Sequence, residues 1–527
     1  MFCLRLQMVS QARDNPYDKL KSLVRGLFLV FSYLYFPFAC YTTLMKAKLF
    51  VFGMLNFAVG VATRTFFEIP FDYLLIVFGL VIGIFFIKKD RKIFALAMGL
   101  AGFIFGFFWL GFYELKTQPN INITNEVVAK VWDLEGSNQF QSQTYLVKPI
   151  NSNFYVRTRT EKYPKYELGD TLRVSGVFKK NNDPRAQKDH IYYSVDYPKI
   201  SYLEGFKKAK EYDYYLILKQ KMVSLSFDLN TKIDQIYPEP YSSLASGVLL
   251  GGRSNFSKET LNKFSVVGII HIVAVSGYNV VIIATILGHI LKRAPRRFKF
   301  MAFAFGIWGF VLLTGASSSA VRAGAMASVL LLARFVGRDY YPLGSVLFAS
   351  SVMIFSNPLI LVYDLGFQLS FLAVVGIIYF YPLLSSFVKN KGLISETLLV
   401  TLSAQVLTMP LIAYKFGMIS LVAPLANILI LPVIPYLMAT VAISVVGSFL
   451  LPSFGILVGF VGWVMMEYIF RTVDYLSKIS WSSVQSSFTF WHMIIIYFII
   501  LDIRLMTLKH GKIKKEEDFL HSNSIAS

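Results

Sequence analysis

The chain has 527 residues, of which 55% are hydrophobic and 16% are charged. This composition indicates an integral membrane protein and excludes an ordinary soluble protein. Because Cys3 and Cys40 are the only cysteines, a disulfide framework and a thiolate metal site are excluded as well. The formal net charge of +21 is typical of positive-inside topology, and it would also suit a polyanionic cargo.

Three apolar runs near the N-terminus predict transmembrane helices: 49–67, 71–87 and 93–113. The basic stretch "KKDRK" at 88–92 indicates a cytoplasmic turn, so the segment from Gln118 to Gly205 is expected outside. An earlier run, 26–45, has basic flanks on both sides and is left as a re-entrant or an interfacial element. Together these residues form a predicted N-terminal membrane domain, 1–117.

The segment 118–205 changes its hydrophobic period. It contains five short alternating stretches separated by polar turns: "EVVAKVWDL", "SQTYLVK", "FYVRTRT", "GDTLRVSGVFK" and "IYYSVDY". Alternation with β-branched and aromatic residues is typical of strands, and five such strands suggest a small barrel of the OB type. The sequence therefore predicts a polytopic α-helical membrane protein with an inserted extracytoplasmic OB-like β-barrel.

OB barrels often bind single-stranded nucleic acid through basic side chains and stacking aromatic rings. Residues of these types in the predicted strands are the possible DNA contacts of this domain: Trp132, Tyr155, Arg157, Arg159 and Lys162. Aromatic residues are also ordinary strand and core residues, so a spacer or assembly role for the domain stays open.

The stretch from Lys207 to Asp234 is amphipathic and basic, which predicts a linker helix at the outer membrane surface over 206–240. A second membrane domain, 241–508, and a basic cytoplasmic tail, 509–527, complete the predicted organisation. The second membrane domain is expected to contain these helices: 265–291, 299–315, 318–336, 343–356, 364–385, 394–412, 436–450, 454–472 and 488–507.

The number of crossings constrains the segment 418–434. If the helix at 394–412 ends outside and the tail is inside, an odd number of crossings must follow, but four candidates are present. "APLANILILPVIP", at 423–435, carries three prolines, so it is predicted to be a broken or re-entrant element. Such backbone is tolerated at membrane depth only where protein buries it or where it lines a cavity.

Polar residues recur inside the apolar segments. In "GIIHIVAVSGYNVVII", a single helix over 265–291 would place His271, Ser276 and Asn279 on one broad face. Other predicted spans supply further polar residues at membrane depth: Arg322, Asp364, Gln368, Gln405 and Asn427. Such residues usually mark a pathway or gate, and the alternative is mutual pairing that fixes helix register.

Four ordered motifs resemble those of the ComEC competence proteins: "LLGGRSNFSKETLNKFSVVGIIHIVAVSGYNV", "SSSAVRAGAMA", "NPLILVYDLGFQLSFLAVVGI" and "SAQVLTMPLIAYKFGMISLVAPLANILILP". The resemblance covers about residues 45–507. It implies an inner-membrane channel that carries single-stranded DNA into the bacterial cytoplasm during natural transformation, with the polar set on its path or gate. Expected partners are single-stranded DNA, the lipid bilayer, a DNA-delivering receptor, a separate nuclease, and a cytoplasmic motor or strand-binding protein.

Two departures from the family pattern limit what is carried over. The family commonly has a histidine two residues after the glycine of its "SG" motif, where this chain has Asn279. Many members also carry a C-terminal metallo-β-lactamase-like domain, but the six histidines here form no H-x-H-x-D-H cluster. We expect a member without that domain, with no enzymatic activity, no catalytic residues, no metal and no cofactor; no phosphate-binding G-x-x-x-x-G-K-[ST] loop occurs either.

Other hypotheses remain beside this one. An intramembrane serine hydrolase would use Ser276 with His271, His289 or His492 as the base, although Ala274 replaces the first glycine of a G-x-S-x-G elbow. A small-solute or lipid transporter would show inverted repeats, which are not evident.

Arg322 has two possible roles. It either pairs with Asp364 or faces a hydrated path used by phosphates. We favour the second role, because a path for a polyanion requires a fixed positive group.

Overall fold

The structure of the chain is a computed structural model. It describes 43–67, 91–121, 123, 125–137, 142–161, 163–202, 214–251, 256–273, 277–337, 342–388, 392–485 and 487–504, with scattered positions between 74 and 84. The predictions for Lys162, for Ser276, for the tail and for most of 26–45 and 71–87 lie outside these residues.

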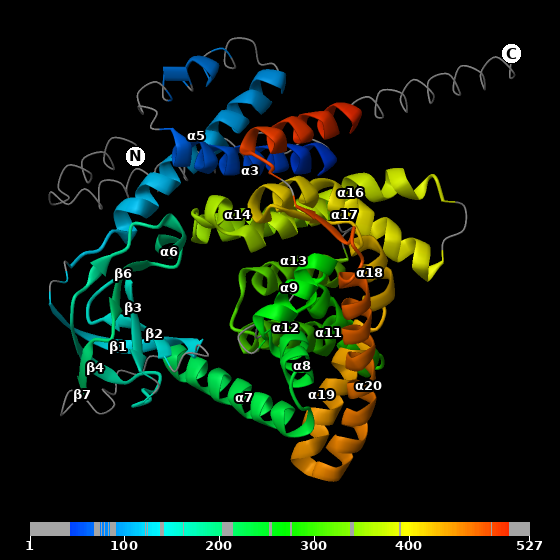
Figure 1. Ribbon diagram of the computed structural model, residues 1–527. Helices are drawn as coiled ribbons and strands as arrows, with labels where there is room; N and C mark the ends of the chain where they lie inside the picture. Colours follow the sequence, from blue (N-terminus) through cyan, green and yellow to red (C-terminus); the bar gives the residue numbers. More distant parts are fainter. Residues whose placement is uncertain are drawn as a thin grey trace, which may run out of the picture.

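Two long N-terminal helices, α3 (Thr43–Phe66) and α5 (Arg91–Thr117), pack closely against each other (Figure 1). Glycines on both helices allow this approach: a Cβ at Gly60 would lie 2.0 Å from the carbonyl oxygen of Phe103. A Cβ at Gly106 would likewise lie 2.0 Å from the carbonyl oxygen of Phe57. Small residues let membrane helices come together in this way, and the pair brings the end of α5 beside the β domain.

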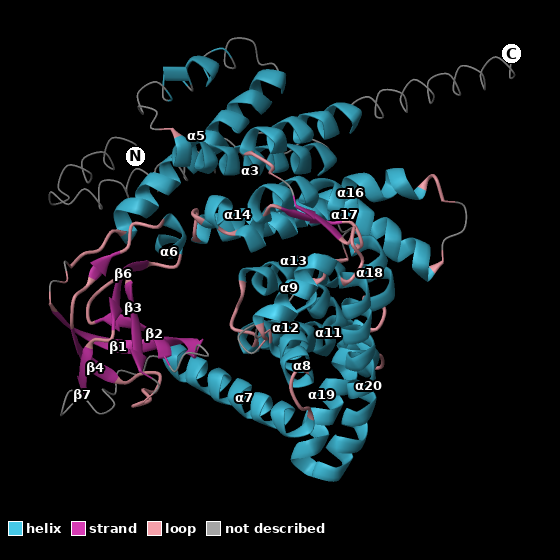
Figure 2. Ribbon diagram, in the orientation of Figure 1, coloured by secondary structure: helices cyan, strands magenta, loops and turns pink. Residues whose placement is uncertain are grey.

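The β domain (residues 126–202) contains seven strands and one short helix: β1 (Glu126–Ser137), β2 (Ser142–Pro149), β3 (Tyr155–Glu161), β4 (Thr171–Ser175), β5 (Lys179–Lys180), α6 (Pro184–Lys188), β6 (Ile191–Asp196) and β7 (Lys199–Tyr202). The strands form one sheet in the order β5-β6-β3-β2-β1-β4-β7 (Figure 2). The pairing is antiparallel except between β3 and β6. Alternate residues of β3, including Val156 and Thr158, point into the core of the domain.

The predicted strands are confirmed as β1, β2, β3, β4 and β6, but the predicted closed barrel is wrong: the described strands form an open sheet with β5 and β7 at its edges. Strand β1 is a central strand that pairs with β2 on one side and β4 on the other, and two irregularities in its pairing with β2 bend its second half. Strand β5 has only two residues, which leaves too short a ladder to close the sheet against β7.

Helix α7 (Tyr214–Ile236) connects the β domain to the second membrane domain. Near its start, Lys219 Nζ donates to the carbonyl of Trp132 at 3.0 Å and lies 2.7 Å from the Asp133 carboxylate. At its other end, Ile233 joins the hydrophobic core of the membrane helices. Figure 1 shows α7 running as a strut between the two parts.

The second membrane domain consists mainly of helices: α8 (Tyr241–Leu250), α9 (Lys258–Val267), α10 (Ile270–Val273), α11 (Gly277–Ile290), α12 (Arg296–Leu313), α13 (Ser318–Val336), α14 (Pro342–Ser356), α15 (Ile360–Tyr363), α16 (Leu365–Ser385), α17 (Leu393–Phe416), α18 (Ala423–Ile430), α19 (Ile434–Leu450) and α20 (Pro452–Ser477). A small hairpin pairs β8 (Met418–Ser420) with β9 (Ser483–Gln485). Residues 490–504 are helical as well.

Within the described part of the chain, four helices are long and apolar enough to cross a membrane: 93–117, 365–385, 394–416 and 452–477. Helices α18 and α19 together make a fifth candidate, bent by 47° at a short break. The predicted interruption in the proline-rich segment is therefore confirmed, and it falls at Pro432. These apolar helices support a membrane protein.

The single helix predicted over 265–291 is wrong, because this segment is divided into α9, α10 and α11. Gly268 ends α9 with φ +82°, and a Cβ there would lie 2.6 Å from the Cβ of Ala423. Glycine adopts this left-handed conformation without strain, and the close neighbour leaves no room for a side chain. His271 and Asn279 consequently lie on different helices and do not share a helical face.

Candidate functional site

The β domain meets the second membrane domain at the corner between α15 and α16. Asp364 occupies this corner and caps α16, because its Oδ1 accepts a hydrogen bond from the backbone N–H of Phe367 at 2.8 Å. A carboxylate at a helix N-terminus is stabilised by the unpaired N–H groups and by the helix dipole. Gln368 braces the same corner, since its Nε2 donates to the carbonyls of Leu361 and Val362 at 2.9 and 2.8 Å.

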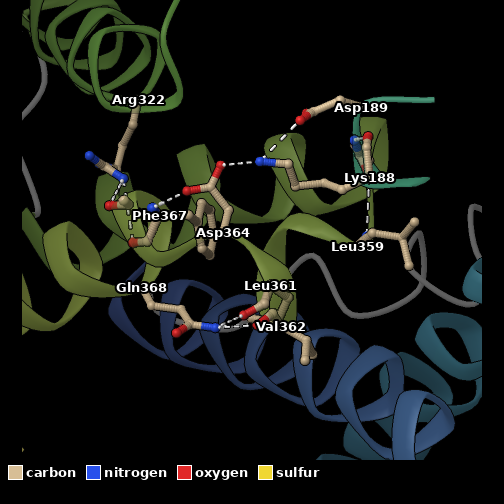
Figure 3. Close-up of polar contacts among 11 residues, drawn as sticks. Lys188, Asp189, Arg322, Leu359, Leu361, Val362, Asp364, Phe367 and Gln368 are labelled. Carbon is tan, nitrogen blue, oxygen red and sulfur yellow. Dashed lines mark hydrogen bonds and ion pairs between the residues drawn. The ribbon is translucent and has the colours of Figure 1, made fainter. Parts of the chain in front are cut away.

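Lys188, at the end of α6, joins the β domain to this corner (Figure 3). Its Nζ lies 3.1 Å from Asp364 Oδ2 and 3.5 Å from Asp189 Oδ1. The Lys188 and Asp364 side chains are only 17% and 11% exposed, so this ion pair is largely withdrawn from water. The backbone carbonyl of Lys188 also accepts a hydrogen bond from Asn357 Nδ2 at 2.8 Å, so two contacts of Lys188 hold the β domain against the second membrane domain.

A cleft of about 430 Å³ opens at this junction. Its charged lining consists of three cations and three carboxylates: Arg157, Arg185, Lys188, Asp183, Asp189 and Asp364. Two of these residues, Arg157 and Asp364, come from the two separate sets of predicted site residues. The structure thus brings a predicted contact of the β domain together with a predicted residue of the membrane path.

The outer face of β3 leads into the cleft. Tyr155, Arg157 and Arg159 alternate with buried residues of the strand and stay partly exposed. The ring of Trp132 lies 5.9 Å from that of Tyr155, and Lys148 Nζ lies 4.7 Å from the centre of the Trp132 ring. Four of the five predicted contacts therefore lie on one face of the sheet, together with Lys148, which sequence reasoning missed because its strand register was unknown.

Arg322, on α13, lies behind the corner and is 1% exposed. Its Nη1 approaches the carbonyl oxygens of Gly366 and Phe367 at 3.3 and 3.4 Å, and its Nη2 donates to Ser319 Oγ at 3.0 Å. Figure 3 shows this guanidinium directed at the first turn of α16. These contacts favour a structural role, in which Arg322 fixes α13 against α16. The guanidinium does this through backbone carbonyls and Ser319, and the predicted partner, Asp364, forms its ion pair with Lys188 instead.

The other predicted path residues lie elsewhere in the second membrane domain, and none of them lines the cleft. Asn279 is 2% exposed and donates from Nδ2 to the carbonyl of Val248 at 3.0 Å. His271 is exposed on α10, and Gln405 is half-buried on α17. Asn427, 6% exposed on α18, has a buried Oδ1 with no hydrogen-bond partner among the described residues.

The histidines considered as hydrolase bases have local contacts. His289 Nδ1 lies 2.9 Å from the carbonyl of Thr285 on its own helix, and His492 Nδ1 lies 2.7 Å from Thr489 Oγ1. In the parts of the chain that the structure describes, no group of three or more His, Cys, Asp or Glu side chains is placed to hold a metal ion.

A second contact between the β domain and the membrane helices involves His190, which the sequence analysis did not single out. Its Nε2 lies 3.1 Å from the hydroxyl of Tyr113 on α5, and its buried Nδ1 has no partner among the described residues. Burial lowers the pKa of His190 below its ordinary value; Asp189 opposes this effect and Lys148 adds to it. A signal for this residue was hard to find, because a lone histidine in a soluble segment carries no spacing pattern.

Residues 248–510 match the family described as Competence protein. The chain is 26% identical over 263 residues to ComE operon protein 3 of Bacillus subtilis (strain 168), covering 49% of this chain and 32% of that relative. It is 29% identical over 256 residues to an uncharacterized protein of Aquifex aeolicus (strain VF5), covering 47% of this chain and 57% of that relative. The matched region thus spans about a third and somewhat over half of these two relatives. No solved structure matches the chain. Through residues 248–510, which hold all four motifs of the resemblance, this chain belongs to the ComEC-like competence protein family.

Proposed function

We propose that this protein is a multi-pass channel of the bacterial inner membrane that carries single-stranded DNA into the cytoplasm during natural transformation. Membership of the competence family supports an involvement in DNA uptake. The observation that carries the proposal is the continuity between the aromatic and basic face of β3 and the cleft at Asp364.

The face of β3 has the chemistry that a single strand requires. Trp132 and Tyr155 offer ring faces on which bases stack regardless of sequence. Arg157, Arg159 and Lys148 offer positive charge to the phosphates. In this proposal the β domain is an extracytoplasmic module, built on an open sheet, that receives the strand and passes it to the cleft.

The channel in this proposal performs no covalent chemistry of its own. A receptor delivers the DNA, a separate nuclease supplies the single strand, and a cytoplasmic motor or strand-binding protein draws it inward. A strand is the more suitable cargo because a duplex would require a pore about 20 Å wide, which is hard to build from helices about 10 Å in diameter.

The test is binding of a fluorescent oligothymidylate to the full-length protein in lipid nanodiscs, followed by fluorescence anisotropy. Arg157→Gln should weaken binding and reduce the slope of log affinity against log salt by about one, because one phosphate contact is lost. Tyr155→Leu should weaken binding by about 1–3 kcal/mol with little change in the salt slope, since stacking is lost instead.

Arg173→Gln is the matched control, because Arg173 is an exposed arginine on β4 that pairs with Glu126 at 3.1 Å and does not line the cleft. It should bind the oligonucleotide as the unaltered protein does. Equal binding by all four proteins, with normal transformation frequency in cells producing Arg157→Gln, would contradict the proposed path.

A further inference from the structure

We propose that the junction cleft is a phosphate-binding site in which Lys188 exchanges the Asp364 carboxylate for a phosphodiester oxygen of the cargo. The same exchange makes Lys188 a latch between the β domain and the second membrane domain. This inference rests on the proposed function for the nature of the anion. It adds that Lys188 binds the strand and that the ion pair between Lys188 and Asp364 opens when it does so.

The closed state of the latch is the arrangement seen in the structure. The Lys188 ammonium lies 3.1 Å from the Asp364 carboxylate, in a pair that is mostly shielded from water. Among the described residues, the other contact that Lys188 makes across the junction is through its backbone carbonyl, which accepts a hydrogen bond from Asn357 Nδ2. An anion can replace the first contact but not the second, so binding of an anion loosens the junction without separating it.

Asp364 retains stabilising contacts after Lys188 has left. Its Oδ1 still accepts the hydrogen bond from the backbone N–H of Phe367, and its charge still lies at the N-terminus of α16. The positive charge of Arg322 also acts on it electrostatically. A buried carboxylate that lost its only partner would resist release, whereas this one keeps a hydrogen bond, a helix dipole and a nearby cation.

Lys188 is suited to bind the incoming phosphate. An ammonium group binds phosphate as a compact point charge and does not require the two-pronged geometry of a guanidinium. Arg157 and Arg185 line the same cleft and offer positive charge to the neighbouring phosphates of the strand. Since Arg157 also belongs to the outer face of β3, a strand that stacks on Tyr155 reaches Lys188 by following that face.

The acidic residues of the cleft limit the strength of this site. Asp183 Oδ1 accepts from the backbone N–H of Arg185 at 2.9 Å, where it caps α6. The carboxylate of Asp189 lies 3.5 Å from Lys188 Nζ and competes with a bound phosphate for this ammonium group. A transport site must bind well enough to be entered and weakly enough to be left, which a balanced set of three cations and three carboxylates provides.

The latch is tested by measuring the distance between the two parts of the full chain in nanodiscs by pulsed electron paramagnetic resonance. Spin labels are attached to cysteines at Val177 and Phe387, each 77% exposed, with Cys3 and Cys40 changed to serine. Without DNA, Lys188→Gln and Asp364→Asn should each broaden the distance distribution and shift it outward. Lys188→Arg, which keeps the charge, and Lys199→Gln, which removes an exposed lysine of β7, should leave it unchanged.

Adding oligothymidylate should produce the same broadening in the unaltered protein, and inorganic phosphate at equal phosphate concentration should produce less of it. A distribution in Lys188→Gln as narrow as that of the unaltered protein would overturn the latch. An oligonucleotide that binds, by anisotropy, without broadening the distribution would overturn the exchange and leave the proposed function standing. Failure of the oligonucleotide to bind the unaltered protein would overturn the proposed function and the exchange together.

Gel filtration is the folding control: each variant should elute as a single peak at the volume of the unaltered protein before its distances are compared.

Discussion

Lys188 and Asp364 are 176 positions apart in the chain, yet their side chains meet at 3.1 Å. One belongs to a five-residue helix of the β domain, and the other caps a long helix of the second membrane domain. This pair joins the two segments that the sequence assigns to different environments, and it lies in a cleft that both segments line. The junction is therefore where a predicted residue of the β domain, Arg157, and a predicted residue of the membrane helices, Asp364, line one cleft.

Arg322→Gln should lower the stability of the protein. The variant loses charge-assisted contacts to two carbonyls of α16, and hydrogen bonds to charged groups contribute about 1.5–3 kcal/mol each. The expected result is a lower melting temperature in detergent and less folded protein in the membrane. Arg297→Gln, at an exposed arginine on α12, is the control and should behave as the unaltered chain. A normal melting temperature with lost DNA uptake would show that Arg322 acts on the cargo instead.

Exchanging the charges, as Arg322→Asp with Asp364→Arg, would not separate these two roles. An arginine at position 364 would face Lys188, which lies within 3.1 Å of the present carboxylate. Two cations at that distance repel each other, so the double variant should be less stable than Arg322→Gln alone. DNA uptake normalised to the amount of folded protein is the measurement that discriminates.

Asn279→Leu should destabilise the contact between α11 and α8. The Asn279 amide donates to the carbonyl of Val248, which lies in the last turn of α8, where carbonyls lack partners within the helix. Leucine has a similar size but no donor, so the buried carbonyl is left unpaired at a cost of about 1–3 kcal/mol. Thermal unfolding in detergent should show the loss. An unchanged melting temperature would mean that this hydrogen bond does not support the fold.

Gly60→Ala should disrupt the packing of α3 against α5, whereas Gly53→Ala should be tolerated. Both glycines lie on α3, but a Cβ at Gly60 would meet the carbonyl oxygen of Phe103 at 2.0 Å, and one at Gly53 meets nothing within 4 Å. Forcing packed elements apart costs about 1–3 kcal/mol. Folded yield and melting temperature of the two variants make a matched comparison on one helix. Equal behaviour of the pair would contradict the close approach.

Docking of the β domain on α5 should weaken as the pH falls. Burial lowers the pKa of His190 in the folded protein, so the folded state resists protonation and the unfolded or undocked state takes up the proton first. The contribution of His190 is therefore complete above its ordinary pKa of 6.5 and is lost progressively below that pH. Thermal unfolding of the full chain from pH 7.5 down to about pH 5 measures this change.

His190→Asn is the matching variant, because asparagine does not titrate and accepts the left-handed backbone at this position, where φ is +59°. It should remove part of the pH dependence below 6.5. Asp189 and Lys148 lie near His190, with opposite effects on its pKa, and both remain in the variant. A pH profile identical to that of the unaltered protein would show that His190 is not the group responsible.

Much of the architecture follows from local pattern. Long apolar runs require helices in a bilayer, and alternating segments require strands with one buried face, so α3, α5, α16, α17, α20 and the five main strands could be predicted. Prolines in the segment around Pro432 likewise predicted its break, because proline removes a backbone donor. Periodicity failed at Gly268, where a contact with Ala423 from a distant segment requires a left-handed glycine that ends the helix.

The sequence by itself determined which residues were chemically capable of a site, and the tertiary structure decided which of them meet. Residue type placed Arg157 in a basic strand and Asp364 at a helix start, but no local rule relates two segments so far apart in the chain. Lys188, which the sequence analysis did not single out, is the central residue of the cleft because folding withdraws its ammonium from water and places it against a carboxylate. Distances between remote segments arise from packing and sheet topology, and these depend on the whole chain.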